Sequence, residues 1–214
     1  AHQLGTPISS LMAWVAILRE NYPDDDLLPE LDKDVKRLEL IAERFSKIGS
    51  QPESSREDMG GLLERVADYI RRRCSDRVEV VCLPPPAPVE AEVCAPLFEW
   101  VIENLCKNAI DAMAGCGRIT LALWREAGHV VIEVTDTGKG ISKRHFKTVF
   151  TPGYTTKKRG WGLGLSLAKR IVEQYHRGHI FVKSSELGVG TTFRIELHDA
   201  VAVFPSASVG GEKG

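Results

Sequence analysis

Two apolar stripes near the start of the chain constrain its fold more than any other feature. Apolar residues recur three and four positions apart over residues 4–18 and again over 28–48, with charged residues on the remaining sides. A polar stretch with Pro23 separates the stripes, so residues 1–49 are predicted to form a helical hairpin. Two thin helices cannot bury both apolar faces against each other. We therefore expect two hairpins to pair into a four-helix bundle in a homodimer.

A second, mixed domain is predicted beyond a polar linker at residues 50–57. This order of elements predicts an α+β fold in which residues 58–198 form a two-layer α/β sandwich. Residues 199–214 have little periodicity and are expected to be a flexible tail. The expected helices lie at 62–70, 95–113 and 165–175, and the expected strands at 78–83, 119–124, 130–135, 180–184 and 192–197.

Composition argues against several classes of protein. The formal net charge of -1 disfavours nucleic acid as a partner. Five cysteines without a C-x-x-C pair favour reduced thiols and a cytoplasmic location. No apolar run reaches the roughly 20 residues that cross a bilayer. The chain begins inside a helical pattern without a start methionine, so any membrane contact is expected only through a missing upstream part.

Histidines of the second domain lack metal-ligand spacing and are expected to be structural or solvated: His129, His145, His176, His179 and His198.

A glycine-rich segment directly follows the strand expected at 130–135. Its sequence, Asp-Thr-Gly-Lys-Gly-Ile at residues 136–141, places a carboxylate where the strand leaves the sheet, and glycines let the backbone approach a flat ligand. A carboxylate can accept hydrogens from the exocyclic amino group of adenine, which makes Asp136 the candidate base-reading residue. Taken alone, the same segment could be a solvated Asp-x-Gly turn.

A second glycine-rich segment opens the helix expected at 165–175. Residues 160–165 read Gly-Trp-Gly-Leu-Gly-Leu. Glycines at a helix N-terminus expose backbone N–H groups and the positive end of the helix dipole to phosphate. The motif alone is weak evidence, because the dinucleotide-binding fingerprint needs a preceding strand. The preceding residues 155–159 are instead polar and cationic, which suits a lid over a triphosphate.

The helix expected at 95–113 carries amide side chains on one face. Asn104, Asn108 and Asp111 share this face, and apolar residues form the packing face. Amide oxygens are suitable ligands for a magnesium ion that also holds phosphates, so this face is a candidate magnesium site. A solvated polar face is the alternative. Asparagine has poor helix propensity, so two of them four residues apart favour a functional reason.

Together these three segments resemble the N, G1 and G2 boxes of the ATP-binding domain that gyrase, the Hsp90 chaperone, histidine kinases and the MutL repair protein share. Residues 188–193 resemble a further glycine box, and residues 150–157 resemble the phenylalanine box of histidine kinases. The motifs occur in family order within residues 58–198. The resemblance implies ATP and Mg²⁺ as cofactors, the metal being held by Asn108. It also implies nucleotide contacts from Asn104, Lys107, Asn108, Asp111, Asp136, Gly138, Gly140, Ile141, Thr155, Thr156, Lys157, Gly160, Gly162, Leu163, Gly164, Leu165 and Thr191.

The resemblance extends to the first helix. Residues 2–8, His-Gln-Leu-Gly-Thr-Pro-Ile, are similar to the H box of the same kinases, which implies that His2 is the phosphoacceptor. Gln3 stands where most of the family has an acidic residue that orients the imidazole and takes up its proton. Thr6 matches the position that in related kinases orients water to dephosphorylate the partner. The balance between kinase and phosphatase activity therefore stays open.

The resemblance implies a protein-histidine kinase core that autophosphorylates His2 from Mg-ATP. It implies relay of the phosphoryl group to an aspartate in the receiver domain of a response regulator. In ATP-hydrolysing members a glutamate stands four residues before the metal-binding asparagine, and here that position is Asn104, which disfavours hydrolysis by water. One alternative is a nucleotide-binding adaptor or phosphatase-biased pseudokinase, which Gln3 supports because the loss of the usual acidic residue would weaken autokinase activity. Another is an anti-sigma-type serine kinase, a class that has no histidine hairpin.

Overall fold

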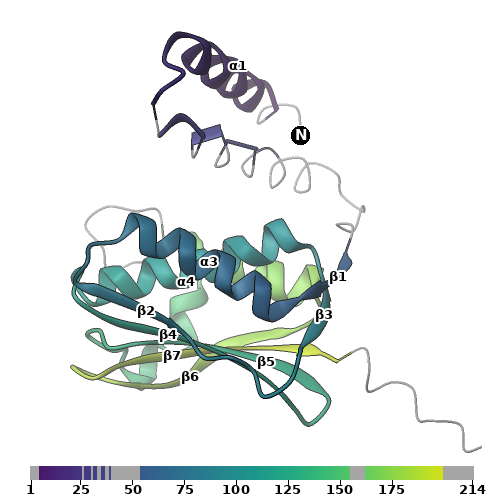
Figure 1. Cartoon of the computed structure of the whole chain (residues 1–214). Helices are drawn as coiled ribbons and strands as arrows, with labels where there is room; N and C mark the ends of the chain where they lie inside the picture. The colour runs from purple at the N-terminus through teal and green to yellow at the C-terminus, as the bar shows by residue number, and fades with distance from the viewer. Residues whose placement is uncertain are drawn as a thin grey trace, which may run out of the picture. The chain divides into compact units, whose positions relative to one another are not determined.

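The computed structural model describes residues 5–25, 27–29, 31–32, 35–36, 39, 54–154 and 162–199 (Figure 1). The chain divides into two compact units, Ala1–Glu53 and Ser54–Gly214. None of the helices within these described ranges is long and apolar enough to cross a bilayer.

The first unit contains α1, Gly5–Asn21, followed by a turn and further helical residues. Val15 of α1 and Val35 beyond the turn are both buried. Arg19 Nη1 lies 3.1 Å from Asp32 Oδ2, so an ion pair also joins the two segments. Much of the second predicted helix lies outside the described residues, and the complete hairpin therefore stays a prediction.

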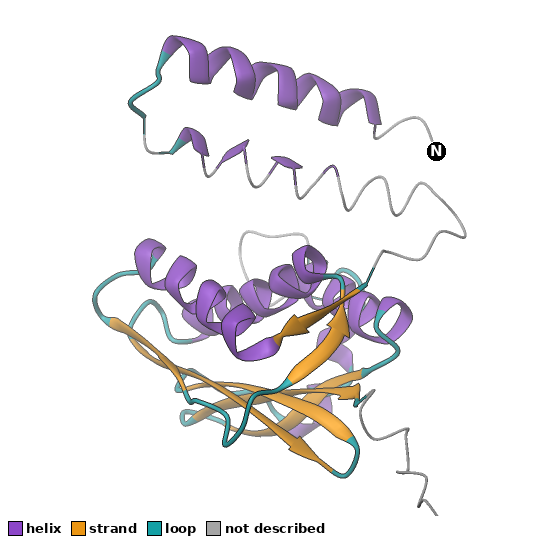
Figure 2. Ribbon diagram, turned by 45° about the vertical axis from the view of Figure 1, so that its right-hand side comes forward, coloured by secondary structure: helices purple, strands orange, loops and turns teal. Residues whose placement is uncertain are grey.

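The second unit is a mixed sheet with helices on one of its faces (Figure 2). Its five strands lie in the order β2-β4-β5-β7-β6, in which β2 is parallel to β4 and the other neighbours are antiparallel. The α+β class predicted for this unit is confirmed. Its elements include α3 Met59–Arg73, β2 Val78–Cys82, α4 Ala95–Ala112, β4 Gly117–Glu126, β5 His129–Asp136, η1 Lys143–His145, η2 Thr148–Phe150, α5 Gly164–Arg170, β6 His179–Glu186 and β7 Gly190–His198.

Alternation along the strands decides which face of the sheet the helices cover. In β4, Ile119, Leu121 and Leu123 are buried, whereas Thr120 and Ala122 between them are half-buried. Successive side chains of a strand point to opposite faces, so the first set faces the helices. Burying one such leucine stabilises the fold by about 1.5–3 kcal/mol. A register shift of one residue would exchange the two sets, and the apolar pattern therefore fixes the register.

Residues 55–58 form a strand that the sequence did not predict. β1, Ser55–Asp58, pairs antiparallel with β3, Glu90–Val93, in a separate two-stranded sheet. The residues from Ser55 onward thus belong to the second unit rather than to a linker. The sequence of β1, Ser-Arg-Glu-Asp, has no apolar alternation, which is why no strand pattern was visible. Asp58 then caps α3 by accepting hydrogen bonds from the backbone N–H groups of Gly60 and Gly61 at 3.1 and 3.2 Å.

The helix predicted at 165–175 changes type in its middle. α5 ends at Arg170 and continues as a π-helix, η3, Ile171–Tyr175. His176 follows, and its Nδ1 donates to the carbonyl of Ile171 at 2.9 Å. The backbone N–H of Cys94, just before α4, donates to His176 Nε2 at 3.0 Å. The ring is therefore neutral, and burial lowers the pKa of His176 below its ordinary value of 6.5.

Protonation of His176 is expected to destabilise the fold in mild acid. The unfolded chain binds the proton first, so the stabilisation is complete above about pH 6.5 and is lost as the pH falls through the folded pKa. His176→Gln should have a lower free energy of unfolding than the parent near neutral pH. As the pH falls below about 6.5, this free energy should decrease less in the variant than in the parent. Denaturant unfolding at several pH values measures this, with the exposed His179→Gln as control. Equal pH slopes in parent and His176→Gln would contradict the assignment.

Candidate functional site

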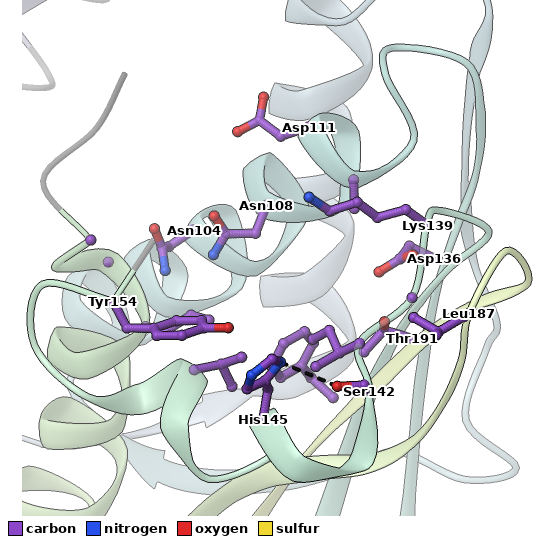
Figure 3. A pocket seen from close by; sticks show the side chains of 18 of the residues that line it. Asn104, Asn108, Asp111, Asp136, Lys139, Ser142, His145, Tyr154, Leu187 and Thr191 are labelled. Atoms are coloured by element: carbon purple, nitrogen blue, oxygen red, sulfur yellow. Dashed lines mark hydrogen bonds between the residues drawn. The ribbon is translucent and has the colours of Figure 1, made fainter. Parts of the chain in front are cut away.

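A cavity of about 790 Å³ opens beside the C-terminal half of α4 (Figure 3). Its walls come from α4, the loop after β5, the start of α5 and the turn between β6 and β7. This volume is within the range of sites that bind small molecules and cofactors. Many of the predicted site residues line the cavity: Asn104, Asn108, Asp111, Asp136, Gly140, Ile141, Gly162, Leu163, Gly164, Leu165 and Thr191.

Asp136 lies buried at the end of β5, opposite Thr191 of β7. Its Oδ1 accepts a hydrogen bond from the backbone N–H of Gly138 at 2.8 Å. Burial raises the pKa of the Asp136 carboxyl, and hydrogen bonds from the Gly138 and Thr191 backbones oppose this shift. Ser185 Oγ links β7 to the loop after β5. It lies 2.8 Å from Thr191 Oγ1 and accepts a hydrogen bond from the backbone N–H of Ile141 at 2.7 Å. A carboxylate fixed in this way can read an amino group by accepting its hydrogens.

The loop after β5 is held against the C-terminal end of α4. The backbone N–H of Lys139 donates to the carbonyl of Ala112 at 2.9 Å. Gly138 packs on Ala112, where a Cβ would lie 2.7 Å from the Ala112 carbonyl carbon, and it does not line the cavity. Gly140 has φ +74° and lies against the backbone of Glu186, which leaves no room for a side chain. The two glycines of this motif therefore shape the loop, and only Gly140 forms part of the wall.

The polar face of α4 points into the cavity, as its spacing predicts. Asn104, Asn108 and Asp111 lie along it in that order (Figure 3). Asn104 Nδ2 is buried and has no hydrogen-bond partner among the described residues, so it is a donor available to a ligand. Lys107 is exposed and does not line the cavity, contrary to the predicted contact. The reason is helical geometry, since Lys107 lies about 100° round the helix from Asn108.

Gly164 brings the first turn of α5 against Asn104. A Cβ on Gly164 would lie 2.5 Å from Asn104 Oδ1, so a larger residue would displace the amide. The carbonyl of Gly162, just before the helix, accepts a hydrogen bond from the N–H of Gly153 at 3.0 Å. The first N–H groups of a helix have no partner within the helix. At this end of α5 they belong to residues of the cavity wall and can bind phosphate oxygens.

Several residues of the cavity were not predicted as site residues. Lys139 lies within the first glycine-rich segment and extends toward the polar face of α4 (Figure 3). His145 Nδ1 lies 3.2 Å from Ser142 Oγ, and the rings of His145 and Tyr154 have centroids 5.7 Å apart. Tyr154 belongs to the phenylalanine box, whereas Leu187 at the β6–β7 turn had no signal in the sequence. The remaining unpredicted lining residues are Ala112, Arg144, Val149 and Phe193.

Other predicted residues cannot be placed in the cavity. Thr6 lies in α1, but its side chain is not described. Among the described residues, no three His, Cys, Asp or Glu side chains form a group that could hold a metal ion. A magnesium site based on Asn108 does not need such a group, because Mg²⁺ keeps several waters and binds substrate phosphates. The predicted residues outside the described ranges are His2, Gln3, Thr155, Thr156, Lys157 and Gly160.

Residues 95–201, half of the chain, match the family model of histidine kinase-, DNA gyrase B-, and HSP90-like ATPases. The chain belongs to this family. Sporulation kinase D of Bacillus subtilis (strain 168) is 27% identical over 206 residues, which cover 92% of this chain and 40% of the relative. Sensor histidine kinase ZraS of Escherichia coli (strain K12) is 29% identical over 204 residues, which cover 92% of this chain and 43% of the relative. The chain thus spans less than half the length of these relatives.

Solved histidine kinases share the fold. The catalytic domain of histidine kinase ThkA matches with a TM-score of 0.62 and 24% identity over 69% of this chain and 96% of that one. Full-length ShkA in complex with AMPPNP matches with a TM-score of 0.69 and 21% identity over 92% and 44% of the two chains. ThkA in complex with the response regulator protein TrrA matches with a TM-score of 0.62 and 20% identity over 95% and 60%.

Replacing Asp136 should separate nucleotide affinity from stability. Its folded pKa is raised, so the ionised form is destabilised by burial, and stability falls as the pH rises through that pKa. Near neutral pH, Asp136→Asn should therefore unfold no more easily than the parent. Its affinity for ATP should nevertheless fall by roughly 1.5–3 kcal/mol, the contribution of a hydrogen bond to a charged group.

Calorimetric titration with ATP and thermal unfolding of the nucleotide-free protein measure the two effects of Asp136→Asn. Unchanged ATP affinity would remove Asp136 from the adenine contact. Lower stability in the variant would show that the hydrogen bonds to the ionised carboxylate stabilise the fold by more than its burial destabilises it.

Proposed function

We propose that this chain is the catalytic core of a sensor histidine kinase, which transfers the γ-phosphoryl group of ATP to His2 and then to an aspartate of a response regulator. The observation that carries the proposal is the cavity. Three features line the same cavity. They are the buried carboxylate of Asp136, the amide side chains on α4, and the glycine-rich N-terminus of α5. These three chemistries suit adenine, magnesium and phosphate respectively. Family membership and the kinase names of the relatives support the same function.

The residues of α4 fit a magnesium nucleotide. Asn108 offers an amide oxygen to the metal, and Asp111 adds a carboxylate at the same wall. Asn104 Nδ2 is a buried donor without a partner among the described residues, and a phosphate oxygen would satisfy it. Bound Mg²⁺ would offset phosphate charge and hold the phosphates in line for transfer.

Asn104 also favours transfer to a protein side chain over hydrolysis. It occupies the position of the glutamate that activates water in the hydrolysing branch of the family, and an amide cannot remove a proton. Glu103 is next to it, but this side chain is buried and is not part of the cavity wall. No described carboxylate on α4 therefore stands at the position of that base. A hydrolysing ATPase is the weaker reading for this reason.

In the transfer step, His2 is the nucleophile that accepts the γ-phosphoryl group. A bond forms from a neutral imidazole nitrogen of His2 to the γ-phosphorus, and the bond from this phosphorus to the bridging oxygen breaks, leaving ADP. The second imidazole nitrogen must then release its proton to give a neutral phosphohistidine. Gln3 can accept a hydrogen bond from that nitrogen but cannot take up the proton, which therefore goes to water.

Pairing of two chains is part of the proposal. On α1, Leu11, Trp14 and Ile17 are exposed by 44%, 63% and 46% of their surface, and Leu31 beyond the turn by 43%. Exposed apolar side chains gathered on one short helix favour burial against a second copy. A four-helix bundle would cover them, and a homodimer is proposed on this ground.

The response regulator is proposed as the partner because ThkA, which shares the fold, has been solved in complex with such a protein. Thr6 would serve the reverse reaction by orienting water for dephosphorylation. The second candidate function is a nucleotide-binding adaptor or phosphatase-biased pseudokinase. The specific observation behind it is Gln3, which removes the usual proton acceptor beside His2.

Asn108→Ala should bind nucleotide but fail to transfer phosphate. The variant loses the amide oxygen that would hold the metal, while the packing face of α4 is unchanged. Phosphorylation by labelled ATP with Mg²⁺ measures the transfer, and fluorescence titration measures binding. Gln174→Ala removes an amide outside the cavity and is the matched control. Wild-type phosphorylation by Asn108→Ala would place the metal elsewhere.

Autophosphorylation should be slow and should accelerate in Gln3→Glu. General-base assistance is typically worth about 10²- to 10⁴-fold, so we expect a gain of at least about tenfold when a carboxylate is restored. His2→Gln is the negative control and should take up no acid-labile phosphate. Gln3→Asn keeps an amide and should show no gain. If Gln3→Glu were no faster at equal ATP affinity, proton removal would not limit the rate, and a pH-independent rate would point to domain motion instead.

A further inference from the structure

The end of the sheet opposite the cavity carries two histidines side by side. His129 opens β5 and His198 closes β7, and the register places them directly opposite each other. Their ring centroids lie 5.3 Å apart with 35° between the ring planes. The same antiparallel ladder ends at Asp136 and Thr191, so the histidine pair and the cavity occupy its two ends. The pair takes no part in the proposed nucleotide contacts.

Hydrogen bonding fixes the tautomer of His129. Its Nδ1 lies 3.0 Å from the carbonyl of Ala127, and a carbonyl only accepts, so Nδ1 carries the hydrogen. Nε2 of His129 is left with a free lone pair. Metal-ligating histidines commonly have this arrangement, in which one ring nitrogen donates to a carbonyl and the other binds the ion. The ring of His198 has no hydrogen bond or ion pair to a described residue and can turn toward the same ion.

The separation of the rings fits a tetrahedral ion. Zinc lies about 2.0–2.1 Å from an imidazole nitrogen, and the ring centroid lies about 1.1 Å further back, so each centroid is about 3.2 Å from the metal. Two such rings at the tetrahedral angle have centroids about 5.2 Å apart. The observed 5.3 Å matches this separation, so the two rings need not move apart or together, although the His198 ring must turn to direct a nitrogen at the ion.

The backbone at this end of the ladder is held on both sides. Ala127 and Gly128, both with positive φ, form the tight turn before β5. The N–H of Asp199, which follows His198, donates to the Gly128 carbonyl at 3.0 Å. Arg125 Nε lies 2.8 Å from Asp199 Oδ2. Two histidines on strands that are held in place lose little conformational entropy on binding an ion. A preorganised site requires this property.

The nearby carboxylates already have partners. Glu126 and Glu196 both pair with Arg194, and Asp199 pairs with Arg125. No third ligand from the described residues completes the pair, in agreement with the absence there of any group of three metal-binding side chains. The ion would keep open positions for water. Imidazole ligands without free carboxylates select zinc, copper or nickel over magnesium or calcium.

We propose that His129 and His198 form a binding site for a divalent transition-metal ion, with Zn²⁺ as the representative, separate from the nucleotide cavity. The ion would join the first residue of β5 to the last residue of β7. These are the two strands whose other ends carry Asp136 and Thr191. The proposal does not depend on the kinase activity, because neither histidine contacts the cavity.

The test uses the full chain without nucleotide, titrated with Zn²⁺ alone by calorimetry at about pH 7.5. We expect His129→Ala and His198→Ala each to weaken a Zn²⁺ site by at least about tenfold, since even loss of an outer partner of a metal ligand costs 10- to 100-fold. His179→Ala, on the neighbouring strand β6 and exposed, is the matched control and should bind as the parent does. ATP affinity should be the same in all variants.

The double variant His129→Ala/His198→Ala separates this site from binding by thiols such as the exposed Cys116. Parent-like Zn²⁺ affinity in the double variant, or an equal loss in His179→Ala, would overturn the proposal. Electron paramagnetic resonance of the parent with Cu²⁺ gives a readout without any substitution. Two imidazole nitrogens on one Cu²⁺ would support the pair, and coordination by a single nitrogen or by sulfur would refute it.

Discussion

The contact between the loop after β5 and the end of α4 determines the shape of the site. The Lys139 N–H satisfies the carbonyl of Ala112, one of the last carbonyls of α4, which the helix itself leaves without a partner. This bond requires Gly138 to touch Ala112 without a side chain between them. Because strand and helix are locked together at this point, Asp136 at the strand end and Asn108 on the helix face the same space. The contact between the loop and α4 therefore sets the positions of two walls of the cavity.

The site retains groups that folding alone would not favour. Asp136 is buried with a raised pKa, and Asn104 Nδ2 is buried without a hydrogen-bond partner among the described residues. Each such group costs stability, because a buried polar atom without a full set of partners loses its hydration. His176, which is half-buried within the second unit but does not line the cavity, behaves in the opposite way, with both ring nitrogens satisfied. This contrast distinguishes the ligand-facing polar groups from the structural ones.

The sequence predicted the elements whose apolar spacing is regular. β4 alternates cleanly, β5 has an apolar, β-branched run, and α4 has one polar and one apolar face. The positions of these elements and the inward direction of Asn104 and Asn108 were therefore accessible. β1 was missed because its polar residues pair only with one short neighbour. The π-helix η3 was missed because its residues have ordinary helical spacing.

Residue roles were less accessible than elements, because a motif marks a segment and not each side chain within it. Lys107 lies within the box that supplies Asn108, yet it points to solvent. Leu187 lies far along the chain from the helix and reaches the cavity only through the β6–β7 turn. His129 and His198 lie far apart along the chain, and only the strand register brings them together. Pairings of this kind depend on topology, and neither local pattern nor spacing contains them.

The ladder between β5 and β7 also places the two proposed sites at opposite ends of one sheet. At one end the strands finish in a buried acid and a hydroxyl, Asp136 and Thr191, enclosed by α4 and the glycine-rich loops. At the other end the paired residues are imidazoles with less cover, and His198 is exposed. Between them the inward side chains Val130, Ile132 and Val134 are fully or almost fully buried. A packed core of this density holds both ends in register. If both proposed sites bind their ligands, each end of the ladder would therefore keep its geometry while the other is occupied.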